Sequence, residues 1–313
     1  MESGESAKVS SLRWGILRRA LLHRSATKPT DDRSNATHKR ISRKSAKGFN
    51  LLPFCFTRKS PDGNESGSRD VCLRFTLPVT GSPSICLYQR MDDDVPDLQD
   101  FEICNKYNID NTGLVCRWPS EDVLAYYCLN HPDIFRSKTV IELGSGYGLA
   151  GLVIGAINKA TKVTITDGNP QVVDYIQHNI NVNSDVFGST EVTSMLLHWN
   201  ECDTVDISGT FDVIVASDCT FFKEFHKGLA RTVKSLLRRD SASEAIFFNP
   251  KRGDSLDKFI TEIKENGLQF TLTENYDPEV WKLHQEFVDG TNNESWPNYQ
   301  TDHCYPLLLR ITL

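Results

Sequence analysis

Glycines recur at every second position between an apolar run and the apolar segment that follows it. Residues 140–143 (VIEL) lead into Gly144-Ser145-Gly146-Tyr147-Gly148. Glycines between a buried strand and a helix let the chain turn sharply and let a ligand lie against the main chain. The N-terminus of the next helix, near Leu149, favours a carboxylate or a phosphate. This loop predicts a site for a nucleotide-like ligand.

An acidic residue stands at the matching distance beyond this loop. Asp167 ends the apolar run 163–166 and lies 23 positions past Gly144, which is the spacing of an acid that grips ribose hydroxyls. A tight turn followed by an unrelated surface aspartate is the alternative, and the combined pattern disfavours it. NAD requires a third glycine three positions after Gly146, where this chain has Leu149.

A second set of candidate residues follows a later apolar run. Residues 211–216 precede Ser217 and Asp218, and in open parallel sheets ligands bind at the carboxyl ends of the strands. Asp218 is therefore expected at the active site, although a helix cap is an alternative role for an aspartate here. Trp118 and Trp199 each have two interpretations, as a cover for a flat ligand or as core residues.

The elements that must position these residues alternate regularly. Helices are predicted over 149–159, 171–182, 225–239 and 254–266, and strands over 139–143, 163–166, 191–197, 211–216, 245–248, 270–273 and 305–313. This alternation predicts an α/β fold with a mostly parallel sheet and helices on both faces. A further helix is expected to begin at Ser120 as N-cap, with Glu121 and Asp122 in its first turn. Residues 70–90 predict a hairpin.

Charge is distributed unevenly along the 313 residues. Residues 1–60 hold 14 Lys and Arg against 4 Asp and Glu, a net charge of +10. Because the whole chain has a net charge of −6, the remaining residues carry −16. We expect a basic, partly helical or disordered arm over 1–47, a β-hairpin region over 48–107 and a catalytic domain over 108–313. The arm either docks an acidic partner, is a solvated tail, or is a targeting segment.

The cysteines predict neither a disulfide framework nor a metal site. The 9 cysteines are odd in number and none forms a C-x-x-C pair, which favours buried thiols of a reducing compartment. No run approaches the roughly 18 apolar residues that a membrane span requires. We therefore expect a soluble protein with no metal and no membrane association.

Residues Glu142-Leu143-Gly144-Ser145-Gly146 resemble the first motif of S-adenosylmethionine methyltransferases, and Asp218-Cys219-Thr220-Phe221 resembles the D-x-x-Y signature of their protein-lysine group. Four further motifs resemble the calmodulin-lysine N-methyltransferase family within that group: Asp110-Asn111-Thr112-Gly113, Trp118-Pro119-Ser120-Glu121, Glu274-Asn275-Tyr276-Asp277 and Tyr305-Pro306-Leu307-Leu308-Leu309. The resemblance is dense over residues 108–313. Phe221 departs from the group's tyrosine, which puts any role of that hydroxyl in doubt.

The resemblance implies a Rossmann-like seven-stranded sheet with one antiparallel strand and an N-terminal extension. It implies S-adenosylmethionine as cofactor, with S-adenosylhomocysteine as product. It implies the following cofactor-binding residues: Trp118, Glu142, Gly144, Ser145, Gly146, Asp167, Trp199 and Ser217. Asp218 and Phe221 are the implied catalytic residues.

The implied activity is trimethylation of a lysine in calmodulin, by a cytoplasmic and also nuclear monomer with no nucleic-acid partner. Two alternatives stay open, a lysine of another protein and an inactive S-adenosylmethionine- or dinucleotide-binding module. Because methyl transfer from a sulfonium needs no covalent intermediate, positioning is expected to supply most of the catalysis, for which well-oriented systems provide roughly 7–11 kcal/mol.

Overall fold

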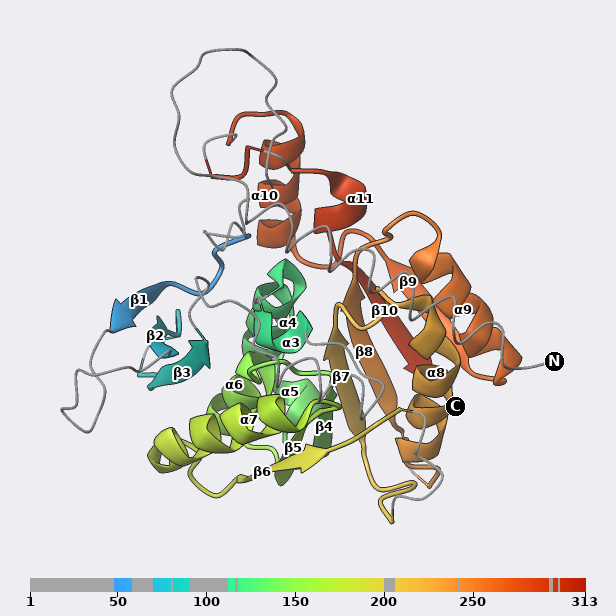
Figure 1. Ribbon diagram of the computed structural model, residues 1–313, viewed down its shortest axis with the longest axis horizontal. Helices are drawn as coiled ribbons and strands as arrows, with labels where there is room; N and C mark the ends of the chain where they lie inside the picture. Colours follow the sequence, from blue (N-terminus) through green and yellow to red (C-terminus); the bar gives the residue numbers. More distant parts are fainter. Residues whose placement is uncertain are drawn as a thin grey trace, which may run out of the picture. The chain divides into compact units, whose positions relative to one another are not determined.

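A mixed sheet of seven strands forms the centre of the catalytic region (Figure 1). The computed structural model describes residues 48–57, 70–79, 81–90, 112–115, 118–199, 206–240, 242–292, 295–297 and 299–313. The described residues all belong to one compact unit over 43–313. The expected basic arm over 1–47 lies outside the described residues, and the division into three domains stays a prediction.

The sheet has the strand order β6-β5-β4-β7-β8-β10-β9. Its members are β4 (Thr139–Leu143), β5 (Lys162–Asp167), β6 (Glu191–Leu196), β7 (Val213–Ser217), β8 (Glu244–Asn249), β9 (Gln269–Thr273) and β10 (Leu307–Thr312). β10 runs antiparallel to both β8 and β9, whereas the pairs from β6 to β8 are parallel. The predicted fold, mostly parallel with one antiparallel strand, is confirmed.

Helices cover both faces of this sheet (Figure 1). One face carries α4 (Pro119–Asn130), α6 (Leu149–Ile157) and α7 (Pro170–Val182), and the other carries α8 (His226–Leu236) and α9 (Ser255–Glu265). Four consecutive residues of β4 and four of β7 are buried, as are five of β8. Continuous apolar strands of this kind are expected where both faces are covered, and the carboxyl ends of β4, β5 and β7 then meet at one edge of the sheet.

A smaller antiparallel sheet precedes the catalytic strands in the chain. It consists of β1 (Phe54–Thr57), β2 (Asp70–Thr76) and β3 (Ser84–Arg90), so the predicted hairpin over 70–90 is present and gains a third strand. The edge of β3 pairs with two asparagine side chains, one in α7 and one at the C-cap of that helix. Asn183 accepts from Cys86 N at 2.9 Å, and Asn179 accepts from Tyr88 N at 2.7 Å. Because these asparagines stand four residues apart on one helix face, they satisfy alternate positions of the strand edge.

The start of α4 differs from the prediction. Ser120 was expected to be the N-cap, but the helix begins at Pro119 and its N-cap is Trp118. Proline suits the first helical position, because it has no N–H to leave unpaired and its φ is already helical. Ser120 therefore lies inside the helix and is buried.

The structure contains four further helices that the sequence analysis did not predict. They are α3 (Thr112–Val115), α5 (Pro132–Phe135), α10 (Pro278–Val288) and α11 (Thr301–Cys304). α10 had a recognisable signal, because the side chain of Asp277 caps it by accepting from Glu279 N and Val280 N. Among the described residues, no helix is long and apolar enough to cross a membrane.

Candidate active site

The glycine loop after β4 follows a path that depends on the absence of side chains. Gly144 and Gly146 both have φ +56, in the left-handed region that glycine enters readily. A Cβ at Gly144 would lie 2.9 Å from Cys219 Sγ and 3.0 Å from the Trp199 ring. The loop, the indole of Trp199 and the residues after β7 are therefore in close contact.

Asp167 ties the end of β5 to the same loop. Its Oδ2 accepts from Gly146 N at 3.1 Å, and its Oδ1 accepts from Asn169 N at 2.9 Å. Ser145 N donates to Thr166 O at 2.9 Å, and Ser145 is buried. The predicted acid thus stands beside the predicted loop, at the carboxyl end of β5.

Two carboxylates of the chain itself occupy the N-terminus of α6. Glu121 Oε1 accepts from Leu149 N at 3.2 Å, and Glu142 Oε2 accepts from Gly151 N at 2.7 Å. A helix end of this kind is predicted to favour a ligand carboxylate or phosphate. Glu121 and Glu142 accept from its N–H groups instead, so these groups are not available to a dinucleotide pyrophosphate. This arrangement disfavours NAD.

Glu142 is consequently placed beneath the loop. It is 1% exposed, and a Cβ at Gly151 would come within 2.6 Å of its Oε2. Burial, reinforced by the neighbouring Glu121 carboxylate, raises the pKa of Glu142 well above its usual range. Its observed contact is to the helix, and its predicted contact with the cofactor stays a prediction.

Replacing Glu142 by glutamine is expected to flatten the pH dependence of stability. The raised pKa means that the folded state keeps this proton at pH values where the unfolded chain has lost it. The free energy of unfolding therefore falls as pH rises from the ordinary carboxyl pKa toward the raised one. Urea denaturation between about pH 5 and pH 8 checks this. Exposed Glu265→Gln is the control, and parallel curves for Glu142→Gln and wild type would contradict the assignment.

The turn after β7 is held rigidly by its neighbours. Asp218 has φ +55 and donates its N–H to Phe248 O at 3.0 Å. Thr220 N donates to Asn249 Oδ1 at 3.3 Å, and Thr220 O accepts from Ser255 Oγ at 2.5 Å. A non-glycine residue in the left-handed region persists only where the surroundings hold it, and such residues cluster at functional sites. Asp218 is therefore presented in one orientation.

Asp218 forms a buried ion pair with a residue that follows β8. Arg252 Nη2 lies 2.5 Å from Asp218 Oδ1, and the two side chains are only 9% and 4% exposed. The guanidinium carbon lies 4.9 Å from the Trp118 ring centroid and 5.0 Å from that of Phe221, and these two rings are 6.2 Å apart. Trp118, Phe221 and Asp218, predicted separately, thus surround one cation.

The structure brings together most of the predicted site residues. Ser217 ends β7 directly before Asp218. Trp199 packs edge-on against Phe225 at 6.1 Å. Sequence reasoning missed Glu121, Cys219 and Arg252 as parts of this site. Burial raises the pKa of the Cys219 thiol well above its usual value, with further contributions from Asp167 and Asp218, so it acts as a neutral packing group against Gly144.

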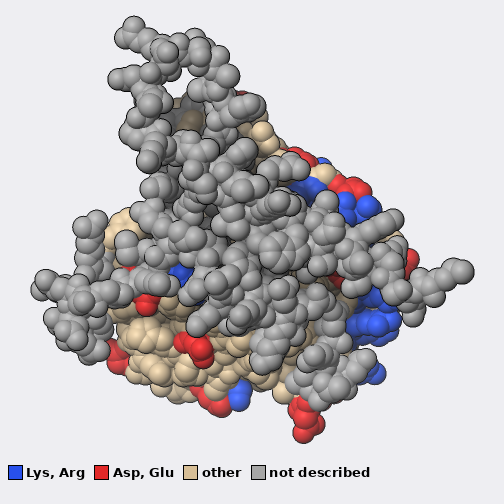
Figure 2. Space-filling model, in the orientation of Figure 1, with Lys and Arg blue, Asp and Glu red and all other residues tan. Residues whose placement is uncertain are grey.

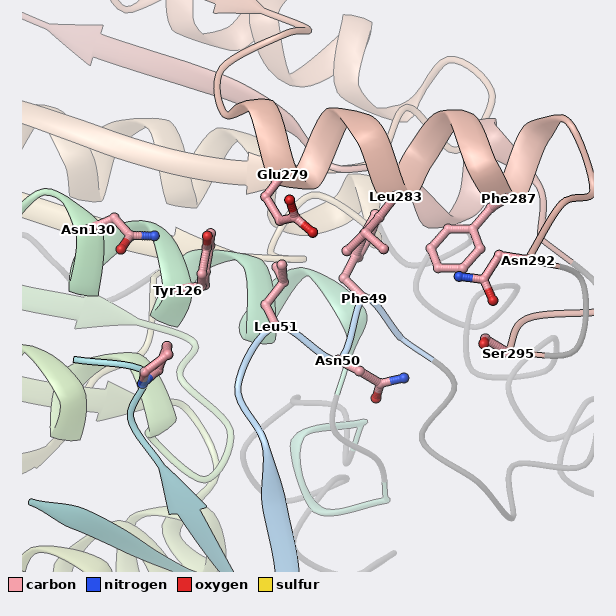
Figure 3. Close-up of a pocket in the computed structure, with 11 residues that line it drawn as sticks. Phe49, Asn50, Leu51, Tyr126, Asn130, Glu279, Leu283, Phe287, Asn292 and Ser295 are labelled. Carbon is pink, nitrogen blue, oxygen red and sulfur yellow. The ribbon is translucent and has the colours of Figure 1, made fainter. Parts of the chain in front are cut away.

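A separate cavity of ≈ 500 Å³ lies between the segment 49–51, α4 and α10 (Figure 3). Tyr126 and Asn130 line it from α4, and Glu279, Leu283 and Phe287 line it from α10. None of its lining residues is a predicted site residue. Within the described residues, no cluster of His, Cys, Asp and Glu is suited to hold a metal ion.

This combination of sheet, glycine loop, strand-end acid and acidic turn defines a Rossmann-like S-adenosylmethionine methyltransferase. Residues 99–266 match the model of the lysine methyltransferase family. The chain is 59% identical to a calmodulin-lysine N-methyltransferase of Arabidopsis thaliana over 98% of both chains. The chain belongs to the lysine methyltransferase family, and it is an enzyme that methylates lysine with S-adenosylmethionine.

More distant relatives share only part of the chain. A protein-lysine N-methyltransferase of Mus musculus is 29% identical over 55% of this chain and 54% of its own. The solved ribosomal protein L11 methylase of Lactobacillus delbrueckii subsp. bulgaricus is 18% identical, with a TM-score of 0.40, over 60% of this chain and 76% of that one.

The residues at the sheet edge fit S-adenosylmethionine. The glycine loop brings main chain to the sheet edge, and Glu121 and Glu142 occupy the N–H groups of α6 that a pyrophosphate would need, a group that this cofactor does not have. Gly144, Gly146, Asp167 and Trp199 are the residues that would hold it. When bound, the cofactor supplies a methyl group activated by a sulfonium.

Proposed function

We propose that this enzyme trimethylates a lysine of calmodulin. The observation that carries the proposal is the 59% identity to the Arabidopsis thaliana calmodulin-lysine N-methyltransferase, which extends over 98% of both chains. The identity therefore extends beyond the residues that form the predicted catalytic domain. Similarity in those outer regions is expected where two enzymes bind the same protein substrate.

The arrangement around Asp218 suits a lysine side chain. Trp118, Phe221 and Asp218 already hold the cationic side chain of Arg252 in this structure, and a lysine bound next to Arg252 would have the same carboxylate and an aromatic rim beside it. With S-adenosylmethionine bound, the lone pair of this amine would accept the methyl group as the S–C bond breaks, so the positive charge would pass from sulfur to nitrogen. The amine must release its proton to solvent before each transfer, since a free lysine has a pKa of about 10.4.

A basic surface on α8 supports an acidic partner. Lys227, Arg231 and Lys234 are exposed and recur at helical spacing, and Figure 2 shows Lys and Arg side chains gathered on the side where α8 and α9 lie. Calmodulin is acidic because its calcium loops require carboxylates. Complementary charge of this kind raises the association rate and weakens with salt. A docking role for the arm over 1–47 is a further part of the proposal.

Transfer of labelled methyl groups tests the substrate. The full-length enzyme is incubated with labelled S-adenosylmethionine and unmethylated calmodulin, with calcium and with a chelator, and in parallel with a lysate that contains unmethylated calmodulin. Label in calmodulin, lost when the acceptor lysine is changed to arginine, is the expected result. Label only in another protein would instead favour a different lysine substrate.

A cytoplasmic and nuclear location is also proposed, on the cysteine pattern alone.

The trimethyl product is expected because Phe221 brings no hydroxyl to the acceptor side. The Phe221 ring contacts Phe222 at 4.6 Å between centroids, so the rim of the site at this point is aromatic. Without a hydrogen bond from a tyrosine to hold one amine orientation, the mono- and dimethylated amines can rotate and react again. Mass spectrometry of calmodulin at full turnover checks this, and a product that stops at monomethyl-lysine would contradict it.

A further inference from the structure

Arg252 is built into the acceptor side of the site. Its backbone is held in the left-handed region at φ +47, and its N–H donates to Asp302 O at 2.8 Å. The adjacent Gly253 N donates to Asp302 Oδ2 at 2.7 Å. α11, which contains Asp302, therefore fixes the turn from which the guanidinium reaches Asp218.

The guanidinium is the only charged contact of Asp218 among the described residues. Arg252 Nη2 contacts Oδ1, and no hydrogen bond from the described residues reaches Oδ2. Buried oxygens with unused lone pairs call for a partner that the free chain does not supply. An amine brought against Oδ2, beside Arg252, is such a partner.

Other titratable groups face this pair from each neighbouring element. Cys304 of α11 lies near both members, and Cys219 follows Asp218 in the turn after β7. Burial raises the pKa of both thiols, so they are neutral at physiological pH. Asp302 binds the backbone of Gly253, and the nearby Asp254 is paired with Lys223 and Lys258. Asp218 and Arg252 therefore dominate the local charge.

The charges of Asp218 and Arg252 together affect whether the reacting amine is protonated. A lone buried carboxylate stabilises the protonated form of a neighbouring amine, and an opposite charge within about 4–6 Å commonly shifts a pKa by one to three units. A protonated lysine has no lone pair to attack the methyl group. Asp218 without a counter-charge would thus bind the acceptor tightly in its unreactive form.

We propose that Arg252 is a positioning residue which neutralises Asp218, so that the carboxylate orients the acceptor lysine without holding it protonated. The proposal rests on the binding of that lysine beside Asp218. Arg252 acts through Asp218, and it is not required to touch the methyl group.

The pH dependence of kcat with unmethylated calmodulin tests this role. Arg252→Gln is expected to move the acidic limb of the profile to higher pH by about one to three units. Arg252→Lys keeps the charge and should leave the limb where it is in wild type. The double variant with Asp218→Asn removes both charges, so its limb should return toward the wild-type position. The adjacent exposed Lys251→Gln is the matched control.

Binding of n-butylamine in the presence of S-adenosylhomocysteine provides a readout that needs no protein substrate. Wild type should favour the neutral amine, so its affinity should rise about tenfold per pH unit below about pH 10.4. Arg252→Gln should bind the ammonium form, with affinity that changes little over the same range. Calorimetry measures both.

The outcomes separate this inference from the proposed function. If Arg252→Gln only lowers turnover, with an unchanged limb and an unchanged slope for n-butylamine, Arg252 is structural and the inference is overturned. If calmodulin takes no label, the substrate proposal fails, while the n-butylamine slopes still decide the role of Arg252. If Asp218→Asn has wild-type turnover, the acceptor lies elsewhere and both the placement and the inference fail.

Discussion

Replacing Asp218 by asparagine is expected to lower turnover by at least about tenfold, equivalent to roughly 1.4 kcal/mol of transition-state stabilisation. The change removes the carboxylate that orients the acceptor amine and leaves the shape of the side chain intact. Affinity for S-adenosylhomocysteine should change little, since the glycine loop and Asp167 are unaltered. Steady-state kinetics and calorimetry with the purified full-length chain measure the two effects separately.

The same variant is also expected to be less stable. Asp218 and Arg252 are 4% and 9% exposed, and removal of one partner of a buried pair commonly costs about 3–5 kcal/mol, because the other charge is left uncompensated. Turnover is therefore compared at a temperature where circular dichroism shows both proteins folded. The neighbouring exposed Asp254→Asn is the control, because its carboxylate pairs with surface lysines. Equal turnover of Asp218→Asn and wild type would remove Asp218 from the site.

Replacing Gly144 by alanine is expected to weaken the binding of S-adenosylhomocysteine by more than about tenfold. The left-handed backbone alone costs an L-residue roughly 1–2 kcal/mol. The new Cβ would also lie 2.9 Å from Cys219 Sγ and 3.0 Å from the Trp199 ring, so the indole or the turn after β7 must shift. Either shift would alter the surface on which the cofactor is expected to lie. Isothermal titration calorimetry measures the loss.

Gly146→Ala is the matched comparison for this effect. Gly146 has the same φ of +56, but a Cβ there would meet nothing closer than Gly113 O at 3.6 Å. Both variants carry the backbone cost, and only Gly144→Ala adds the steric overlap. The Gly146 variant should therefore lose less affinity. Equal losses would show that Trp199 and Cys219 do not help to shape the cofactor site.

The catalytic elements could be predicted in detail because their signals are local. The strand over 139–143 agrees with β4, and the helix predicted over 171–182 differs from α7 by one residue at its start. Apolar runs bounded by glycine and polar residues define such elements without reference to the rest of the chain. Ser120 was wrong as an N-cap because the proline before it is a stronger signal.

Some site residues could be predicted and others could not, because only some of them have a local signal in the sequence. Asp167 and the glycine loop are related by a fixed spacing along a βαβ unit, which the chain displays directly. Arg252 was not predicted as a site residue, since nothing in the run Pro250-Lys251-Arg252 indicates a buried partner 34 positions earlier in the sequence. The signal that could have found it is the position of this turn after β8, next to the turn that carries Asp218 in a parallel sheet.

The amino-acid sequence by itself determined the alternation of strands and helices, the glycine loop and the strand-end acids, because periodicity and short spacing act within one or two elements. Only the tertiary structure decided that Glu121 and Glu142 cap α6, and that Arg252 lies between Trp118 and Phe221 against Asp218. Those contacts join elements distant in the chain. Their energy comes from burial and from charge compensation, which exist only once the elements have packed.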